Sequence, residues 1–288
     1  AAIASARDYF VRWARLPELY HAFDAGLWEL GQWIAAQPAE TPIYLTPQPA
    51  DHPTLAFAWR PGIDSHGPPV SFDGRHIFPL QSGANSALEQ YAVVEHEDFR
   101  TPLLLPDVFP DATVSLELQD GAGRVDARVY ARPAGSSPRY LPNQPLAAPL
   151  GDGIRLAGYE VIPETPEPGG LLFLRLLWAV DAPPASDWTV FTHVIEPTQS
   201  AAAGAPSPGG AVRAGRDGPP GAGSLPTSRW QPGWLIIDEY QIDLPADLAP
   251  GLYGLEAGLY QVSGQRLPSE GAGIFLGNVQ IRPENAAP

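Results

Sequence analysis

The sequence predicts two fold classes in one chain: an α+β domain, or a small α/β layer, followed by an all-β antiparallel sandwich. Near the start there is a single long helical pattern, and short strand-like runs follow it. From about Gly151 onward the apolar runs are all typical of strands, with Pro and Gly between them. We therefore expect a small α/β domain over residues 1–132, a linker over 133–150 and a sandwich over 151–288.

The helix is expected over about residues 16–36. Its apolar residues recur at spacings of four, four, three and four, which places them on one helical face: Leu19, Phe23, Leu27, Leu30 and Ile34. Pro38 follows and ends the pattern. Just upstream, Tyr9, Phe10 and Trp13 alternate with arginines, a mixture that suits a membrane–water interface. The alternative is an ordinary capping segment that packs its aromatic rings on a neighbour.

Short strands complete the first domain. Apolar and polar residues alternate in "TVSLELQ" from Thr113 and "VDARVYA" from Val125, and the intervening "DGAG" predicts a hairpin. One helix on a small sheet is the economical arrangement. Residues 133–150 contain five prolines and no periodicity, which indicates an interdomain linker.

The second half contains six strand-like runs and no helical pattern. This predicts an antiparallel sandwich of the immunoglobulin-like or jelly-roll-like kind. Between two of these runs, residues 197–233 are rich in turn-forming residues and are expected to be a long flexible loop. The loop is not of the phosphate-binding type, because no lysine follows Gly221 and Gly223 and because Pro226 and Pro232 prevent the required helix.

Composition narrows the classes of partner. The net charge of -15 argues against nucleic acid, which needs basic stripes. The 17 basic residues are all arginine, and Cys and Met are absent, so the chain offers no thiolate nucleophile and no Cys-ligated zinc. Few thermolabile residues and 35 prolines give the chain a thermophile-like composition. No apolar run approaches the roughly 20 residues of a membrane span. The opening "AAIASA" suits either the end of a signal peptide or the last turn of a removed membrane helix.

Motifs of catalysis are missing from the sequence. The six histidines are scattered without metal-binding spacing, so no metal site, cofactor or catalytic residue is predicted. His96, flanked by carboxylates in "EHEDF", is interpreted as part of a solvated acidic turn, with a hard-metal or proton-transfer site as the alternative. A pair of carboxylates for glycoside hydrolysis stays open, because the required separation is spatial.

Aromatic residues of the second half are the best candidates for ligand contact. Trp230 and Trp234 flank the turn-rich loop, and Trp188 begins a strand nearby. Exposed indoles stack on sugar rings or fill partner pockets. Asp217 is the fourth candidate, and with Asp238 it could contribute to a calcium site, although the dense spacing of such sites is missing.

Longer stretches carry a family resemblance. The segment from "RDYFVRWARLPELYHAFDAGLWELGQWIA" to "TPIYLTPQPADHPTLAFAW" resembles the region after the last membrane helix of bacterial family 39 glycosyltransferases, which are related to protein mannosyltransferases and aminoarabinose transferases. "WTVFTHVIEP", "LPTSRWQPG" and "IIDEYQIDLPADLAPGLYGLEAGLYQVSGQRLP" are similar to a β-sandwich tail attached to such proteins. The resemblance implies a membrane enzyme that moves sugar from a polyprenyl-phosphate donor, with its catalytic acid upstream of Ala1.

Two functions follow as expectations. The first is a non-catalytic, extracytoplasmic accessory region of such a transferase, tethered by a missing upstream membrane region and recognising acceptor glycan or protein. The second is a secreted or surface-attached module that binds carbohydrate or protein, or that is structural, with no enzyme attached.

Overall fold

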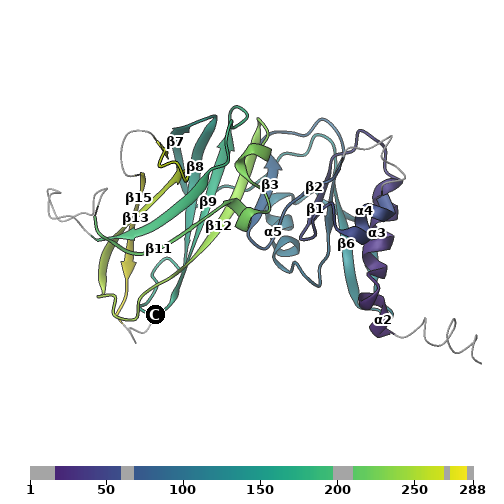
Figure 1. The fold of residues 1–288 in the computed structure, drawn as a ribbon, viewed down its shortest axis with the longest axis horizontal. Helices are drawn as coiled ribbons and strands as arrows, with labels where there is room; N and C mark the ends of the chain where they lie inside the picture. Colours follow the sequence, from purple (N-terminus) through teal and green to yellow (C-terminus); the bar gives the residue numbers. More distant parts are fainter. Residues whose placement is uncertain (1–16, 60–67, 197–209, 269–272, 284–288) are drawn as a thin grey trace, which may run out of the picture. The chain divides into compact units, whose positions relative to one another are not determined.

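The computed structural model describes residues 17–59, 68–196, 210–268 and 273–283 (Figure 1). The chain divides into two compact units. Unit 1 comprises residues 1–75 and 83–139, and unit 2 comprises residues 76–82 and 140–288. The described residues form several sheets and few helices, which confirms the predicted class of a β-rich, sandwich-containing fold. No helix in these ranges combines the length and apolarity that a membrane span requires.

Unit 1 is a mixed sheet with helices. Its elements are α2 (Pro17–Ala22), α3 (Ala25–Ala35), β1 (Ile43–Thr46), α4 (Pro53–Trp59), β2 (Val70–Ser71), β4 (Glu89–Val93), α5 (Arg100–Val108), β5 (Thr113–Gln119) and β6 (Val125–Arg132). The sheet order is β2-β1-β4-β6-β5. Strand β1 pairs in parallel with β2 and β4, whereas β4, β6 and β5 pair antiparallel, so the expected hairpin between β5 and β6 is present.

The core of unit 1 lies between the sheet and the helices α3 and α4. The apolar face of α3 supplies three of its buried residues, Leu27, Leu30 and Ile34. These pack with side chains from α4 and from strands β1 and β6. On the other face, Tyr44 and Tyr91 stack with ring centroids 4.6 Å apart, and Phe109 at the end of α5 lies 5.4 Å from Tyr91. Because neighbouring residues of a strand point to opposite faces, the sheet packs against α3 and α4 on one face and against the end of α5 on the other.

The predicted helix over 16–36 is two helices in the structure, α2 and α3. Asp24 separates them in the left-handed conformation, with φ 50° and ψ 37°. Aspartate tolerates this conformation better than most residues, and the Asp24 carboxylate accepts a hydrogen bond of 2.8 Å from Thr54 Oγ1. The periodicity continued through the break, so the sequence alone did not indicate it. Phe23, assigned to the buried face, is exposed at the break.

Unit 2 is a sandwich of two antiparallel sheets. Its strands are β3 (Ile77–Gln81), β7 (Gln144–Gly151), β8 (Ile154–Ile162), β9 (Leu171–Val180), β10 (Thr189–Ile195), β11 (Val212–Gly218), β12 (Trp234–Asp243), β13 (Gly251–Tyr260), β14 (Arg266–Leu267) and β15 (Ile274–Ile281). One sheet has the order β3-β12-β9-β8-β7, and the other has the order β11-β10-β13-β14 with β15 also paired to β13. A hydrogen bond of 2.6 Å from the Tyr159 hydroxyl to the Leu276 carbonyl links the two sheets.

Three expectations about unit 2 need correction. The last part of the segment expected as a linker, residues 144–150 of 133–150, belongs to strand β7. The prolines of β7 are tolerated because β7 is an edge strand, where a missing N–H leaves no partner unpaired. Strand β3, expected in the first domain, pairs with β12 and belongs to unit 2. Within the expected flexible loop 197–233, residues 210–233 form strand β11 and two short 3-10 helices, η4 (Pro220–Gly223) and η5 (Thr227–Arg229), while 197–209 lie outside the described residues.

Candidate functional site

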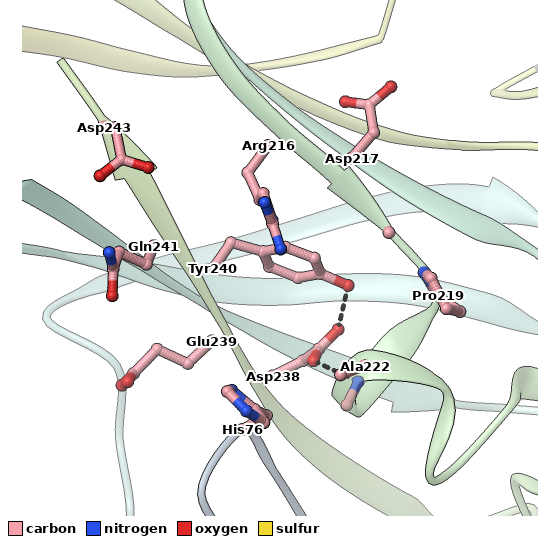
Figure 2. A pocket seen from close by; sticks show the side chains of 12 residues that line it. His76, Arg216, Asp217, Pro219, Ala222, Asp238, Glu239, Tyr240, Gln241 and Asp243 are labelled. Atoms are coloured by element: carbon pink, nitrogen blue, oxygen red, sulfur yellow. Dashed lines mark hydrogen bonds between the residues drawn. The ribbon is translucent and has the colours of Figure 1, made fainter.

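A pocket of about 440 Å³ opens in unit 2 beside strands β11 and β12 (Figure 2). We call it the β12 pocket. It is lined by the end of β11, by η4, by the second half of β12 and by one residue before β3: Arg216, Asp217, Gly218, Pro219, Gly221, Ala222, Asp238, Glu239, Tyr240, Gln241, Asp243 and His76. Most of these side chains are polar, and both donors and acceptors are among them.

The pocket exists because β3 covers only part of β12. The paired register runs from Trp234 opposite Gln81 to Asp238 opposite Ile77. Beyond this register, the Glu239 amide donates a hydrogen bond of 2.9 Å to the His76 carbonyl, just before β3 begins. Strand β12 continues to Asp243, so its final residues pass beyond β3 and form one side of the pocket.

Asp238 forms a fixed floor. It is fully buried and accepts hydrogen bonds from the Tyr240 hydroxyl at 2.7 Å, the Gly221 amide at 3.1 Å and the Trp178 indole at 3.4 Å. Burial, followed by the charge of Asp238, raises the pKa of Tyr240 well above its ordinary value, so its hydroxyl stays a donor. Because its partners satisfy both oxygens, Asp238 positions the loop and is not free to bind calcium as the sequence suggested.

Gly221 allows the loop to approach Asp238. Its φ of 56° lies in the left-handed region, and a Cβ atom there would lie 2.3 Å from Ile77 Cγ2. Any side chain would therefore meet both backbone strain and a clash. Gly221 is not part of a phosphate-binding loop, but it is needed for the close packing of η4 against Ile77.

The rim of the pocket carries accessible polar groups. Gln241, Asp243 and Arg216 are exposed, and Asp217, whose side chain is 42% exposed, has an oxygen 3.5 Å from His193 Nε2. Glu239 is held by Arg175 at 3.0 Å. Of the four sequence candidates, only Asp217 lines this pocket. Gln241 and Asp243 were missed, although the polar residues of "EYQID" alternate as expected for one accessible face of a strand.

The structure contradicts a surface role for the three tryptophans. Trp188, Trp230 and Trp234 are only 4%, 2% and 2% exposed. The Trp188 indole donates to Asp152 at 2.7 Å, and the Trp230 indole donates to the Leu225 carbonyl at 3.1 Å, with Trp178 packed 6.4 Å from its ring. Their faces are therefore part of the core. Tyr9, Phe10 and Trp13, expected near a membrane, lie outside the described residues.

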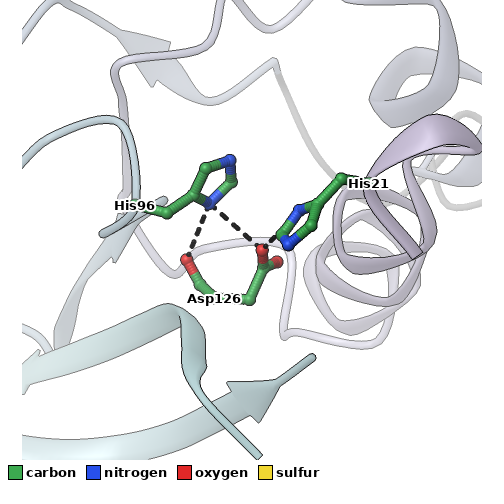
Figure 3. A group of neighbouring side chains, drawn as sticks. All are labelled: His21, His96 and Asp126. Carbon is green, nitrogen blue, oxygen red and sulfur yellow. Dashed lines mark hydrogen bonds and ion pairs between the residues drawn. The ribbon is translucent and has the colours of Figure 1, made fainter. Parts of the chain in front are cut away.

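The interpretation of His96 is confirmed but incomplete. Residues 95–97 form a turn in which His96 is exposed between two glutamates. The sequence did not show that His96 also meets His21 and Asp126 in unit 1, with the two imidazole centroids 5.0 Å apart (Figure 3). Each of the three comes from a different part of the chain, so no sequence spacing indicated the cluster. In the ranges that the structure describes, it is the one group of at least three His, Asp or Glu ligand atoms within 4.8 Å of one another.

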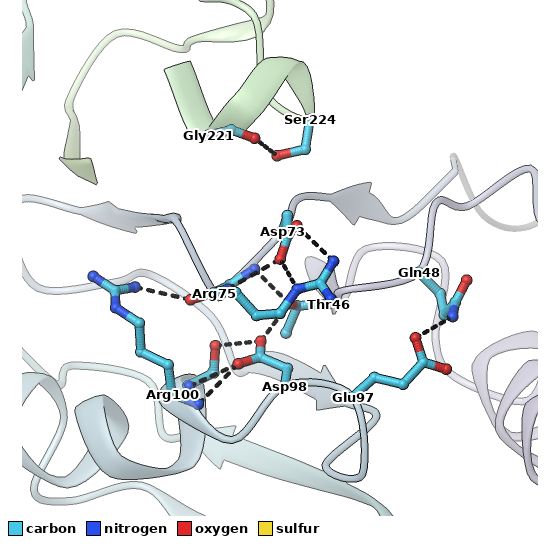
Figure 4. A network of polar contacts seen from close by, with 11 residues as sticks. Thr46, Gln48, Asp73, Arg75, Glu97, Asp98, Arg100, Gly221 and Ser224 are labelled. Carbon is cyan, nitrogen blue, oxygen red and sulfur yellow. Dashed lines mark hydrogen bonds and ion pairs between the residues drawn. The ribbon is translucent and has the colours of Figure 1, made fainter. Parts of the chain in front are cut away.

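A second polar network in unit 1 is structural (Figure 4). The fully buried carboxylate of Asp98 accepts hydrogen bonds from the Thr46 and Thr101 hydroxyls, at 2.6 and 2.7 Å, and from the Thr101 and Arg100 amides that begin α5. Gly74 is so close that a Cβ would lie 2.1 Å from Asp98 Oδ2. The two oxygens of Asp98 therefore connect the start of α5 to Thr46 at the end of β1.

Comparisons with known proteins identify no family for this chain. No protein-family model matches the chain, and no curated protein matches it. Among solved structures, the chain is similar to the crystal structure of the C-terminal domain of Wzt, with a TM-score of 0.32 and 12% sequence identity over 50% of this chain and 84% of that one. A likeness of this strength supports no conclusion about function.

Proposed function

We propose that unit 2 binds a glycan in the β12 pocket. The observation that carries the proposal is the pair of exposed polar side chains, Gln241 and Asp243, on the part of β12 that extends past β3, next to Glu239, which Arg175 holds. Carboxylate and amide groups at neighbouring positions form paired hydrogen bonds to adjacent sugar hydroxyls, and Arg216 on the opposite wall adds donors.

The chemistry of the lining favours a sugar over other ligands. Asp217, Glu239 and Asp243 repel an anion, and the chain as a whole carries a charge of -15. An apolar ligand would remove water from the exposed side chains of Gln241 and Asp243 and offer them no hydrogen bond in exchange, which costs free energy. The volume of about 440 Å³ lies within the range of about 300–1,000 Å³ that is usual for small-ligand pockets.

The glycan that we propose is the acceptor of a lipid-linked sugar transferase. The support for this step is the resemblance of the sequence to the region following the membrane helices of family 39 glycosyltransferases. In this proposal the chain is the extracytoplasmic accessory region, an upstream membrane region tethers it, and the β12 pocket holds the acceptor near the enzyme.

The alternative is a secreted or surface-attached module with the same pocket and no enzyme attached. Sequencing the gene upstream of Ala1 separates the two. Many hydrophobic spans with an acidic residue in the first external loop support the transferase, whereas a signal peptide alone supports the free module.

Binding itself is tested on a glycan panel with the full chain. We expect weak binding of at least one glycan, and a loss of about 10-fold or more in affinity for Asp243→Ala, because removing one charged hydrogen-bond partner costs about 1.5–3 kcal/mol. Glu164→Ala is the matched control, since Glu164 is exposed on unit 2 and does not line the pocket. Equal affinities for the two variants would contradict the proposal, as would the absence of binding across the panel.

A further inference from the structure

His21, His96 and Asp126 converge in unit 1 (Figure 3), and none of them lines the β12 pocket. His21 lies in the last turn of α2, His96 follows β4, and Asp126 lies on β6. The Nδ1 atoms of the two imidazoles face the same carboxylate oxygen: His96 Nδ1 lies 3.1 Å and His21 Nδ1 lies 3.5 Å from Asp126 Oδ1. Two nitrogen ligands and one oxygen ligand thus point to one place.

Asp126 is buried and oriented toward this place. The residue is 3% exposed, and its Oδ1 atom accepts no hydrogen bond of good geometry from any described residue. Its other oxygen packs against the start of α3, where a Cβ on Gly26 would lie only 1.9 Å away. A small cavity of about 80 Å³ is lined by all three residues, together with Tyr20 and Glu97. A buried carboxylate with an oxygen lacking a hydrogen-bond donor is costly unless a cation neutralises it.

The outer nitrogens of both imidazoles face further carboxylates. His21 Nε2 lies 3.6 Å from Asp120 Oδ2, and His96 Nε2 lies 3.4 Å from Glu97 Oε1. These carboxylates are themselves held: Asp120 accepts the Ala122 and Arg124 amides at 2.8 and 2.9 Å, and Glu97 accepts Gln48 Nε2 at 2.6 Å. Metal-binding histidines commonly donate their other N–H to a carboxylate, which leaves the inner nitrogen as a lone pair for the ion.

We propose that His21, His96 and Asp126 bind one divalent transition-metal ion of the zinc class. Two imidazole nitrogens and one carboxylate oxygen are ligands that Zn²⁺ accepts at about 2.0–2.2 Å, whereas Ca²⁺ and Mg²⁺ prefer sets of oxygens. The imidazoles are 41% and 40% exposed, so the ion enters from solvent and keeps solvent in its remaining position. The bound ion joins α2 to the sheet at β6.

The alternative is an arrangement without metal. His96 Nδ1 also lies 3.4 Å from the backbone carbonyl of Asp126, so each ring could simply pair with the aspartate when protonated. That arrangement would place two like charges in rings 5.0 Å apart. Metal titration distinguishes the two arrangements directly, and its outcome does not depend on the glycan proposal.

The test is calorimetric titration of the full chain, without an affinity tag and after chelator treatment, with Zn²⁺ and in parallel with Mg²⁺. We expect one Zn²⁺ per chain and much weaker Mg²⁺ binding. His21→Ala and His96→Ala should each weaken Zn²⁺ binding at least about 10-fold, and Glu97→Gln should weaken it about 10-fold through the orientation of His96. His52→Ala is the control, because His52 also lies in unit 1 and belongs neither to the cluster nor to the β12 pocket.

Two further measurements, thermal stability and the absorption of bound Co²⁺, distinguish loss of the metal site from loss of folding. Both cluster histidines are on the surface, so their alanine variants should melt like the wild type in chelator, and only the wild type should gain thermal stability on addition of Zn²⁺. Bound Co²⁺ should give the visible absorption of a low-coordinate N/O site, lost in His96→Ala. Absence of Zn²⁺ binding, or binding unchanged in both histidine variants, would overturn the proposal.

Discussion

For single residues, the sequence predicts which residue types could contact a ligand, but not which way their side chains point. Asp217 was identified as a candidate, and it lines the β12 pocket. Residue type and position beside a turn-rich loop favour Trp230 and Trp234 as ligand contacts, but the sequence does not show whether an indole points inward. The loop folds back on the sandwich, so these rings pack in the core.

Trp230 is therefore expected to matter for stability and not for stacking on a ligand. Trp230→Ala should lower the free energy of unfolding by about 3–5 kcal/mol, because it leaves a large cavity in a packed core. Trp230→Phe should cost less. Urea unfolding followed by circular dichroism measures both values, and unchanged stability in Trp230→Ala would show that the ring is not part of the core.

Acid sensitivity is also a matter of single residues, with Asp120 as the clearest case. Hydrogen bonds from the Arg124 amide, then the Arg124 side chain and the Ala122 amide, outweigh burial and lower the pKa of Asp120 to about 2. A carboxylate with a lowered pKa stabilises the fold above its ordinary pKa of 3.8, and this stabilisation is lost as the pH falls through about 2.

Comparison with Asp120→Asn tests this. The wild type should be the more stable protein at pH 5, and the difference between the melting temperatures should shrink as the pH falls from about 4 toward 2. Thermal melts in chelator at a series of pH values give the measurement. A difference that stays constant over this range would show that Asp120 has no special role in acid stability.

At the scale of elements, apolar runs predicted strands β8, β9, β12 and β13, and alternation predicted the hairpin of β5 and β6. Alternation did not predict burial, because residues 253–259 of β13 are buried on both faces of the strand. The break at Asp24 and the ordered loop after β11 were not predictable in the same way. Both depend on backbone conformations that tertiary contacts stabilise, such as the Gly221 amide bonded to Asp238.

In this loop, substitutions at the adjacent residues Gly221 and Ala222 are expected to change the free energy of unfolding in opposite directions. Gly221→Ala should destabilise unit 2 by more than about 1 kcal/mol, since its φ is positive and its Cβ would meet Ile77. Ala222, with φ 54° and an exposed side chain, already carries this backbone strain, so Ala222→Gly should be neutral or stabilising by up to about 1 kcal/mol. Chemical unfolding measures both, and equal effects of the two substitutions would contradict the account.

For the whole molecule, the sequence predicted an α/β half followed by a β-sandwich half, and the observed class agrees. It did not predict that the chain enters unit 2 at His76, supplies β3 and returns to unit 1 at Gly83. A single short run such as "RHIFPL" carries no information about which sheet it joins. That detail bears on function, because the length of β3 decides how much of β12 is left to form the pocket.

A fragment of residues 140–288 should therefore be an incomplete sandwich. It lacks β3, so the edge of β12 from Trp234 to Asp238 loses its pairing strand. We expect the fragment to melt lower or to aggregate, and a synthetic peptide of residues 76–82 added in excess should raise its melting temperature. No effect of the peptide would show that β3 contributes little to the sandwich.

The central claim, that the β12 pocket binds a glycan, is tested most directly by mapping a bound sugar onto the chain. Amide signals of the ¹⁵N-labelled protein are recorded as the best-binding glycan from the panel is added. The account predicts that the signals of Gly218, Gly221, Gln241 and Asp243 shift together, and that those of the unit 1 core around Leu30 and Ile34 do not. Shifts confined to another surface, with the pocket signals unchanged, would contradict it.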